Sequence, residues 1–274
     1  MDDYRCCNDW YIMNDKSDFD RLRKQTDITY EVVGEDQMIY YQNGIQNTLE
    51  DAKKGRGLLS KFTGVPEEKI AVIHNKTDGK SVVGLMGDLK EYSNDGLKTK
   101  DVVNAKILED ISKNGEQNTI IAFSAGNKDA QKAMEVLALE GRNLGGTVEY
   151  ISVGSPVKME DLKEVSEKVG INVVSQHNTW KDPVANTMAW VGATGGTAAL
   201  GTLVGVGAGA SLASGAGPVS AYFGALVGGG VGGGVGLHSL HKYHSLESYL
   251  QKDTSSIQST LKDIGDREKS RLLK

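Results

Sequence analysis

Cysteine and proline are scarce in this chain, and positive charge is not in excess. The 274 residues include two cysteines, the neighbours Cys6 and Cys7, and four prolines. Neighbouring cysteines rarely bridge each other and cannot form a zinc site alone, which argues against a disulfide framework. The net charge of −5 provides no basic surface for nucleic acid. We therefore expect no metal, no cofactor and no nucleic-acid partner.

The start of the chain lacks an apolar run. Residues 1–5 are acidic and polar, so no secretory signal peptide of the usual kind is expected, and export would need another route. Residues 1–36 are polar without a clear period. We interpret them as an N-terminal lead-in to a domain that spans residues 37–274.

Strand-like and helix-like segments alternate after this lead-in. Strands are predicted at residues 38–41, 69–74, 119–123, 147–153 and 171–175, and helices at 48–62, 101–113, after Ser124, and at 161–169. The alternation predicts an α/β fold with a mainly parallel sheet and helices on both faces. Ligands of such sheets bind outside the carboxyl ends of the strands, where Asn43, Ser124 and Asp182 are expected.

The run TIIAFSAGN, residues 119–127, is the most informative in the sequence. A β-branched strand leads directly into Ser124, small residues flank it, and a helix follows. This is the sequence form of a nucleophile elbow, whose strained backbone needs tiny residues two positions before and after the serine, here Ala122 and Gly126. The helix start would also direct N–H groups toward an oxyanion. The usual pattern has Gly in place of Ala122, and an ordinary strand–helix turn is the alternative.

Charged residues are absent between residues 183 and 237. This segment has no Asp, Glu, Lys, Arg or His, and 17 of its 55 residues are glycine. It divides near Pro218 into two arms, each long enough to cross a bilayer as a helix. Small residues recur at a spacing of four, a pattern typical of membrane helix pairs, at Gly192, Gly196, Gly201, Gly205, Gly224, Gly228, Gly232 and Gly236.

We interpret residues 187–237 as a helical hairpin insertion that engages a membrane. In water, glycine costs a helix about 1 kcal/mol relative to alanine, so these arms would be poor soluble helices. A flexible Gly-rich loop and a hairpin that packs on the core are the alternatives. From His244 onward the pattern returns to a charged amphipathic helix.

A serine nucleophile needs a histidine base and a carboxylate that orients the histidine. In α/β-hydrolases the order along the chain is Ser, then Asp or Glu, then His. Asp182 is the best placed acid, because it follows the predicted strand 171–175 by a short loop. A simple Asp-Pro turn is the alternative interpretation of this residue.

His244 is the favoured base, because it stands just before the last helical pattern. His241 and His238 are the fallbacks, whereas His74 and His177 precede the acid and are expected to be structural. The spacing of three residues among the last three histidines also allows a metal cluster. No carboxylate or cysteine close in sequence completes one, and we expect none.

Four motifs in this order resemble those of α/β-hydrolase lipases: YQNGIQNT (41–48), AFSAG (122–126), DPV (182–184) and HSLESYL (244–250). They are most similar to bacterial secreted lipase and phospholipase toxins, including type VI secretion lipase effectors. The resemblance implies Ser124 as nucleophile, Asp182 as orienting acid and His244 as base. It also implies an oxyanion hole at the N–H groups of Ala125 and of Gly44 or Ile45.

The leading hypothesis is a serine hydrolase that cleaves acyl esters of membrane phospholipids through an acyl-enzyme. The resemblance implies a toxin made in the cytoplasm, exported by a specialised secretion system and acting at a membrane, with an immunity protein or a secretion carrier as partner. A second hypothesis is a membrane-inserting toxin or pore former on an inactive hydrolase scaffold. A third is a soluble esterase or thioesterase whose Gly-rich arms form a lid.

Overall fold

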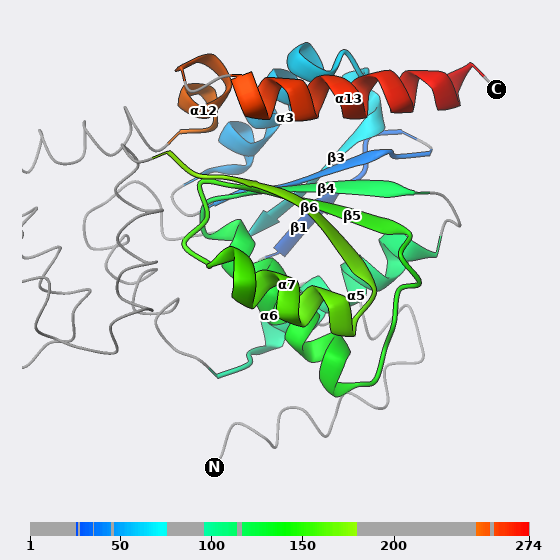
Figure 1. The fold of residues 1–274 in the computed structure, drawn as a ribbon, viewed down its shortest axis with the longest axis vertical. Coiled ribbons are helices and arrows are strands. Elements are labelled where there is room, and N and C mark those ends of the chain that lie inside the picture. Colours follow the sequence, from blue (N-terminus) through cyan, green and yellow to red (C-terminus); the bar gives the residue numbers. More distant parts are fainter. Residues whose placement is uncertain are drawn as a thin grey trace, which may run out of the picture.

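The computed structural model describes residue 26 and residues 28–34, 36–44, 47–75, 96–113, 117–179, 245–252 and 255–273. In these residues a twisted sheet lies between two layers of helices (Figure 1). The predicted α/β class, with a mainly parallel sheet and helices on both faces, is thereby confirmed.

The sheet has six strands in the order β1-β3-β2-β4-β5-β6. Neighbouring strands are parallel except β1, which pairs antiparallel with β3. β2 lies in the middle of the sheet beside β4, with Gln42 opposite Ala122, so these two strands end together. The strands are β1 (Ile28–Glu31), β2 (Ile39–Gln42), β3 (Ile70–Asn75), β4 (Asn118–Phe123), β5 (Val148–Val153) and β6 (Ile171–His177).

Each face of the sheet has its own hydrophobic core. Side chains alternate along a strand, so Tyr40 packs in the core beneath α5 (Thr99–Ser112), α6 (Gly126–Leu139) and α7 (Met159–Lys168). Tyr41 packs in the opposite core, beneath α3 (Leu49–Thr63), α12 (Leu246–Lys252) and α13 (Ser255–Leu272). Figure 1 shows these two groups of helices on opposite sides of the strands. A short 3₁₀ helix, η2 (Glu67–Lys69), precedes β3.

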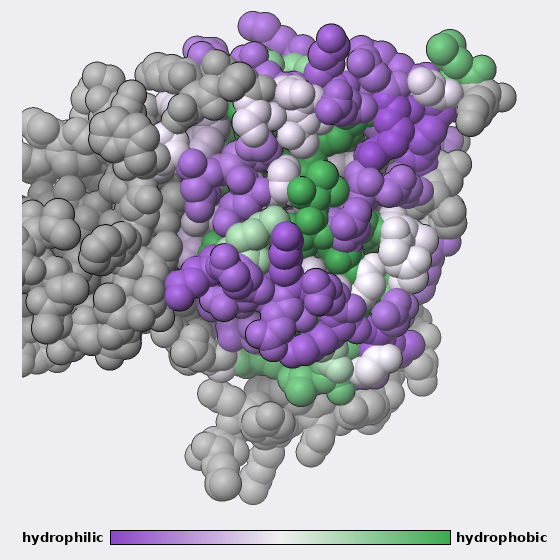
Figure 2. All heavy atoms as spheres, in the orientation of Figure 1, coloured by the Kyte–Doolittle hydropathy of each residue, from purple (hydrophilic) through white to green (hydrophobic). Residues whose placement is uncertain are grey.

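β6 is the edge of the sheet opposite β1. Figure 2 shows hydrophilic side chains over α13 and α7 and hydrophobic side chains over the strands between them. Val174 on β6 is 46% exposed, whereas its neighbour Val173 is buried in the core beneath α7. The helices therefore cover the sheet less completely toward this edge.

The predicted elements match the observed ones to within a few residues, but β1 and η2 were not predicted, and the helical pattern after His244 forms two helices, α12 and α13. The predicted capping box at the start of α3 is present, because the Asp51 N–H donates to Thr48 Oγ1 and the Thr48 N–H donates to Asp51 Oδ2. β1 lies inside residues 1–36, the predicted lead-in. It has four residues, of which only Ile28 is buried, and so short a strand at a sheet edge leaves no clear period in the sequence.

The predicted membrane insertion at residues 187–237 lies outside the described residues. This includes the glycines Gly201, Gly205, Gly224, Gly228, Gly232 and Gly236. Within the part of the chain that the structure describes, no helix combines the length and the hydropathy needed to cross a membrane.

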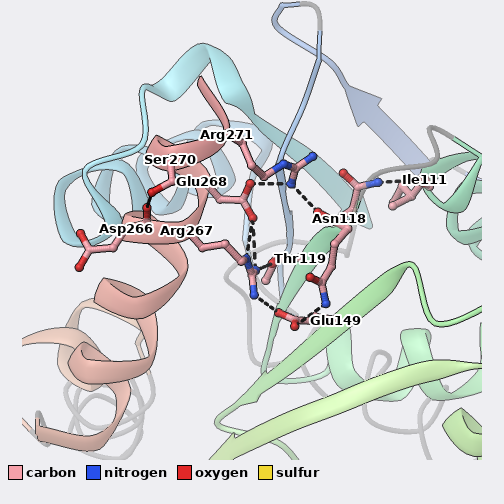
Figure 3. A network of polar contacts seen from close by, with 10 residues as sticks. Ile111, Asn118, Thr119, Glu149, Asp266, Arg267, Glu268, Ser270 and Arg271 are labelled. Atoms are coloured by element: carbon pink, nitrogen blue, oxygen red, sulfur yellow. Dashed lines mark hydrogen bonds and ion pairs between the residues drawn. The ribbon is translucent and has the colours of Figure 1, made fainter. Parts of the chain in front are cut away.

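An ionic network fixes α13 to the amino ends of β4 and β5 (Figure 3). Arg267 donates to Glu149 Oε2 at 2.6 Å and to Thr119 Oγ1 at 2.7 Å. Glu268 is fully buried, and its two carboxylate oxygens accept hydrogen bonds from Arg267 and Arg271. A buried carboxylate is tolerated only when it is paired and hydrogen-bonded, so Glu268 depends on both arginines.

α13 crosses α3 at Gly265, where the two backbones touch. A Cβ atom at Gly265 would lie 1.8 Å from the carbonyl oxygen of Thr63, so no larger side chain fits without moving a helix. The same crossing brings Ile264 into the core beneath α13.

We predict that Gly265→Ala lowers the free energy of unfolding by about 1–3 kcal/mol, because the added methyl group meets backbone that cannot rotate away. Gly57→Ala in α3 is the matched control, since its Cβ would meet only the end of the exposed Glu67 side chain at 3.2 Å. Alanine favours a helix, so the control should be neutral or stabilising. Urea denaturation of both variants measures the difference, and equal stabilities would contradict the close crossing.

Candidate active site

Ser124 adopts a backbone conformation that few L-residues adopt. It lies between the last residue of β4 and the first residue of α6, with φ at 57°. Among the described residues, Asp36 is the one other non-glycine residue with positive φ. Such a conformation costs on the order of 1–3 kcal/mol and persists only where its surroundings enforce it. The N–H of Ser124 donates to the Val153 carbonyl at 2.9 Å, which ties the turn to β5.

Two glycines allow the chain to close around this serine. A Cβ atom at Gly44, just after β2, would lie 2.4 Å from Ser124 Cβ and 2.8 Å from Ser124 Oγ. A Cβ atom at Gly126 would lie 2.6 Å from the carbonyl oxygen of Asn43. The loop after β2 and the turn after β4 are therefore in backbone contact. The small residue that the sequence predicts two positions after the serine has this steric cause.

The side chain of Asn127 stabilises the turn at Ser124 through hydrogen bonds. Its side chain is fully buried, and Nδ2 donates to the carbonyl oxygens of Ala122, Ser124 and Val153 at 2.9–3.2 Å. Its Oδ1 accepts a hydrogen bond from the Tyr150 hydroxyl at 2.9 Å. Burial, with a smaller effect of the Asp129 charge, raises the pKa of Tyr150 well above its ordinary value, so this hydroxyl stays protonated and donates.

The N–H groups predicted for an oxyanion hole flank Ser124. Ala125 immediately precedes α6, so its N–H lies at the positive end of the helix, and Gly44 lies against the serine side chain. Within the described residues, neither of these N–H groups donates a hydrogen bond. The third predicted donor, Ile45, lies outside the described residues. Both N–H groups are therefore without a competing partner in the described part of the chain.

A buried polar network lies next to the turn that contains Ser124. Asp129, in the first turn of α6, is 1% exposed and accepts from Asn75 Nδ2 at 2.5 Å and pairs with Lys100 Nζ at 3.2 Å. The Asn75 N–H donates to Asn43 Oδ1 at 3.1 Å. Sequence reasoning placed Asn43 at this edge but missed the other members. Their one sequence signal is a charged residue, Asp129, on the apolar side of a helix.

Asp101, at the start of α5, is a second buried carboxylate near this network. It is 2% exposed, and Oδ1 has no hydrogen-bond partner in the described part of the chain. Burial raises the pKa of Asp101 to about 6, and the Asp129 charge acts in the same direction. The hydrogen bond from the Lys98 N–H and the charges of Lys100 and Lys132 oppose this shift.

The other predicted members of the triad lie outside the described residues. Asp182 follows the end of β6 by five residues, and β6 ends at the same edge of the sheet as β4. His244 immediately precedes Ser245 and α12, and His238 and His241 also lie outside the described part. The structure therefore gives no distance between Ser124 and any of these groups.

The two described histidines both bind protein groups. His74 at the end of β3 is buried, and its Nε2 lies 2.9 Å from the Asn47 carbonyl oxygen. His177 ends β6, with Nε2 at 3.0 Å from Ser175 Oγ and Nδ1 at 3.3 Å from Ser256 Oγ. Burial lowers the pKa of His177, which keeps its ring neutral at pH 7.

Within the described ranges, no group of three or more histidine, cysteine or carboxylate side chains could hold a metal ion. Comparison of the chain with protein-family models, with curated proteins and with solved structures finds no match. The interpretation of the site therefore depends on its geometry and on the order of motifs in the sequence.

The raised pKa of Asp101 predicts a pH dependence of stability. The folded protein holds this proton up to about pH 6, whereas the unfolded chain releases it near pH 4. The contribution of Asp101 is therefore fully present below about pH 4 and is lost as the pH rises through 6. Relative to Asp101→Asn, the wild type should lose about 3 kcal/mol of stability between pH 4 and 7.5.

Urea denaturation of both proteins across this pH range measures the change. Asp161→Asn, at an exposed position in α7, is the control for the loss of a carboxylate. A constant difference for Asp101→Asn would show that folding does not raise the pKa of Asp101.

Proposed function

We propose that this protein is a serine hydrolase in which Ser124 attacks acyl esters of membrane lipids. The left-handed conformation of Ser124 at the junction of β4 and α6 is the observation that carries the proposal. An ordinary strand–helix turn needs no such strain. Here two glycine contacts and the Asn127 side chain enforce it. Strain maintained in this way is characteristic of sites where a side chain must be presented to a substrate.

The surroundings of Ser124 support an acyl-transfer mechanism. Attack of Ser124 Oγ on an ester carbonyl moves the hydroxyl proton to a base and makes a tetrahedral oxyanion. The N–H groups of Ala125 and Gly44 or Ile45 stabilise that oxyanion. The alcohol leaves with the proton that the base returns, and water then hydrolyses the acyl-enzyme by the same steps in reverse order. His244 is the base and Asp182 orients its ring.

The position of the elbow in the fold supports an α/β-hydrolase domain. In these enzymes one oxyanion donor follows the nucleophile, and the other comes from a loop that connects a strand to the next helix. Ala125 and the loop from β2 to α3 occupy these two positions. Asp182 and His244 follow Ser124 in the order that this class of enzyme uses.

The substrate class comes from the uncharged segment and the resemblance to lipase toxins. Residues 187–237, with their repeated glycines, would hold the enzyme at a bilayer and so raise the local concentration of phospholipid. The same resemblance supports export by a specialised secretion system and a role as a toxin with an immunity protein. A pore former on an inactive scaffold and a soluble esterase with a Gly-rich lid are the competing functions.

We predict that Ser124→Ala lowers ester hydrolysis at least about 10³-fold and leaves the fold intact, because the nucleophile of a cooperative triad is lost. Fatty-acid release from mixed phospholipid vesicles and turnover of a short-chain ester should be measured together. A fluorophosphonate probe should label the wild type and not the variant. Ser166→Ala, a buried serine of α7, is the control and should retain full activity.

Each outcome of this experiment identifies one function. Activity on both substrates that requires Ser124 supports the lipase. Hydrolysis of the short ester alone supports the soluble esterase. Vesicle leakage that is unchanged in Ser124→Ala, without ester hydrolysis, supports the pore former.

Asp182→Asn and His244→Ala should each reduce hydrolysis severely, whereas His238→Ala and His241→Ala should retain most of it. The reason is the order of motifs together with the position of His244 before α12. Steady-state rates of the four purified variants make the comparison. An inactive His241→Ala beside an active His244→Ala would move the base to His241, and full activity of all three histidine variants would refute a triad.

A further inference from the structure

The loop after β2 approaches Ser124 so closely that its position controls the geometry around the hydroxyl. Gly44 lies against both Cβ and Oγ of Ser124, and the Asn43 carbonyl lies against Gly126. If the loop moved away by even about 1 Å, the N–H of Gly44 would no longer reach an oxyanion at hydrogen-bond distance. Something must therefore hold this loop against the turn.

Asn43 has the contacts to do so. Its side chain is fully buried, its Nδ2 donates to the Gly44 carbonyl at 2.6 Å, and its Oδ1 accepts from the Asn75 N–H at 3.1 Å. Asn47 Nδ2 donates to the same Gly44 carbonyl at 3.1 Å. The amide of Asn43 therefore orients the peptide that follows Gly44 and anchors it to the end of β3, using one donor and one acceptor at once.

The anchor continues to the helix that follows the serine. Asn75 Nδ2 donates to Asp129 Oδ2, and Asp129 belongs to the first turn of α6, which starts directly after Ser124 and Ala125. The ion pair with Lys100 of α5 holds the Asp129 carboxylate in a buried position. The loop, β3 and the nucleophile turn thus form a closed ring of contacts. Within that ring, the separation between Gly44 and Ser124 is fixed.

We infer that Asn43 is a positioning residue that, through Asn75 and Asp129, holds the Gly44 N–H at the oxyanion hole. This inference depends on the proposed hydrolase function, because it assigns a purpose to the ring only if Ser124 is the nucleophile. Asn43 does not contact the reacting atoms. It acts on the transition state through the loop, and ground-state binding of the ester changes little.

The test compares Asn43→Ala and Asn43→Asp with Asn118→Ala. Asparagine 118 is equally buried, and its Nδ2 donates to the Ile111 carbonyl at 2.7 Å, but it begins β4 at the end of the strand away from Ser124. Asn43→Asp keeps the size of the side chain and the acceptor for Asn75 but sets a carboxylate oxygen against the Gly44 carbonyl. The Asn43 variants and Asn118→Ala each lose a buried hydrogen bond, but only the Asn43 variants lose the contact that anchors the loop after β2.

Both Asn43 variants should lower kcat for a short-chain ester about 10²-fold, with KM changed less than about threefold, as for loss of one oxyanion donor. Asn118→Ala should show a similar fall in melting temperature with kcat unchanged. The rate of fluorophosphonate labelling should follow kcat. If Asn43→Ala does not fold, the isosteric Asn43→Asp decides the question.

Two failures can be told apart in this experiment. Wild-type kcat in a folded Asn43 variant, or an equal loss of kcat in Asn118→Ala, would overturn the positioning role while Ser124→Ala remained inactive. Full activity of Ser124→Ala would refute the hydrolase itself.

Discussion

The backbone contact between the end of β2 and the turn after β4 is the constraint on which this arrangement depends. β2 and β4 are neighbours in the sheet and end together, so the residues that follow them must share one small space. Only residues without a side chain fit at Gly44 and Gly126, and the chain at Ser124 turns through a left-handed conformation. Parallel pairing of two strands thus determines where the side chain of Ser124 can lie.

The two ends of the sheet are stabilised by different means. At the amino ends of β4 and β5, full charges from Arg267, Glu268 and Glu149 hold α13 in place. At the carboxyl ends, neutral amides carry most of the hydrogen bonds around Ser124, and the nearest ion pair is set behind them. Amides orient a loop without introducing a field that would oppose a developing negative charge.

Much of the fold was predictable from the sequence, because strands such as β3 contain an apolar run, residues 70–73, and helices such as α6 have a clear apolar face. The position of Ser124 was predictable for a local reason, since the elbow is encoded within nine residues. The polar network was not, because Asn75 and Asp129 are 54 residues apart and a charged residue on the apolar side of α6 does not identify its partner. Glu268 looks like any helix surface residue until its arginines and the sheet surround it.

The contacts of Thr179 and His177 have a consequence for the long segment between β6 and α12. The Thr179 N–H reaches the Tyr249 hydroxyl at 3.4 Å, and His177 contacts Ser256, so the described residues on either side of this segment lie close together. The entropy of closing a loop between fixed ends grows only with the logarithm of its length, by about 0.6 kcal/mol for each doubling. A long segment at this position therefore adds little to the entropic cost of folding the sheet.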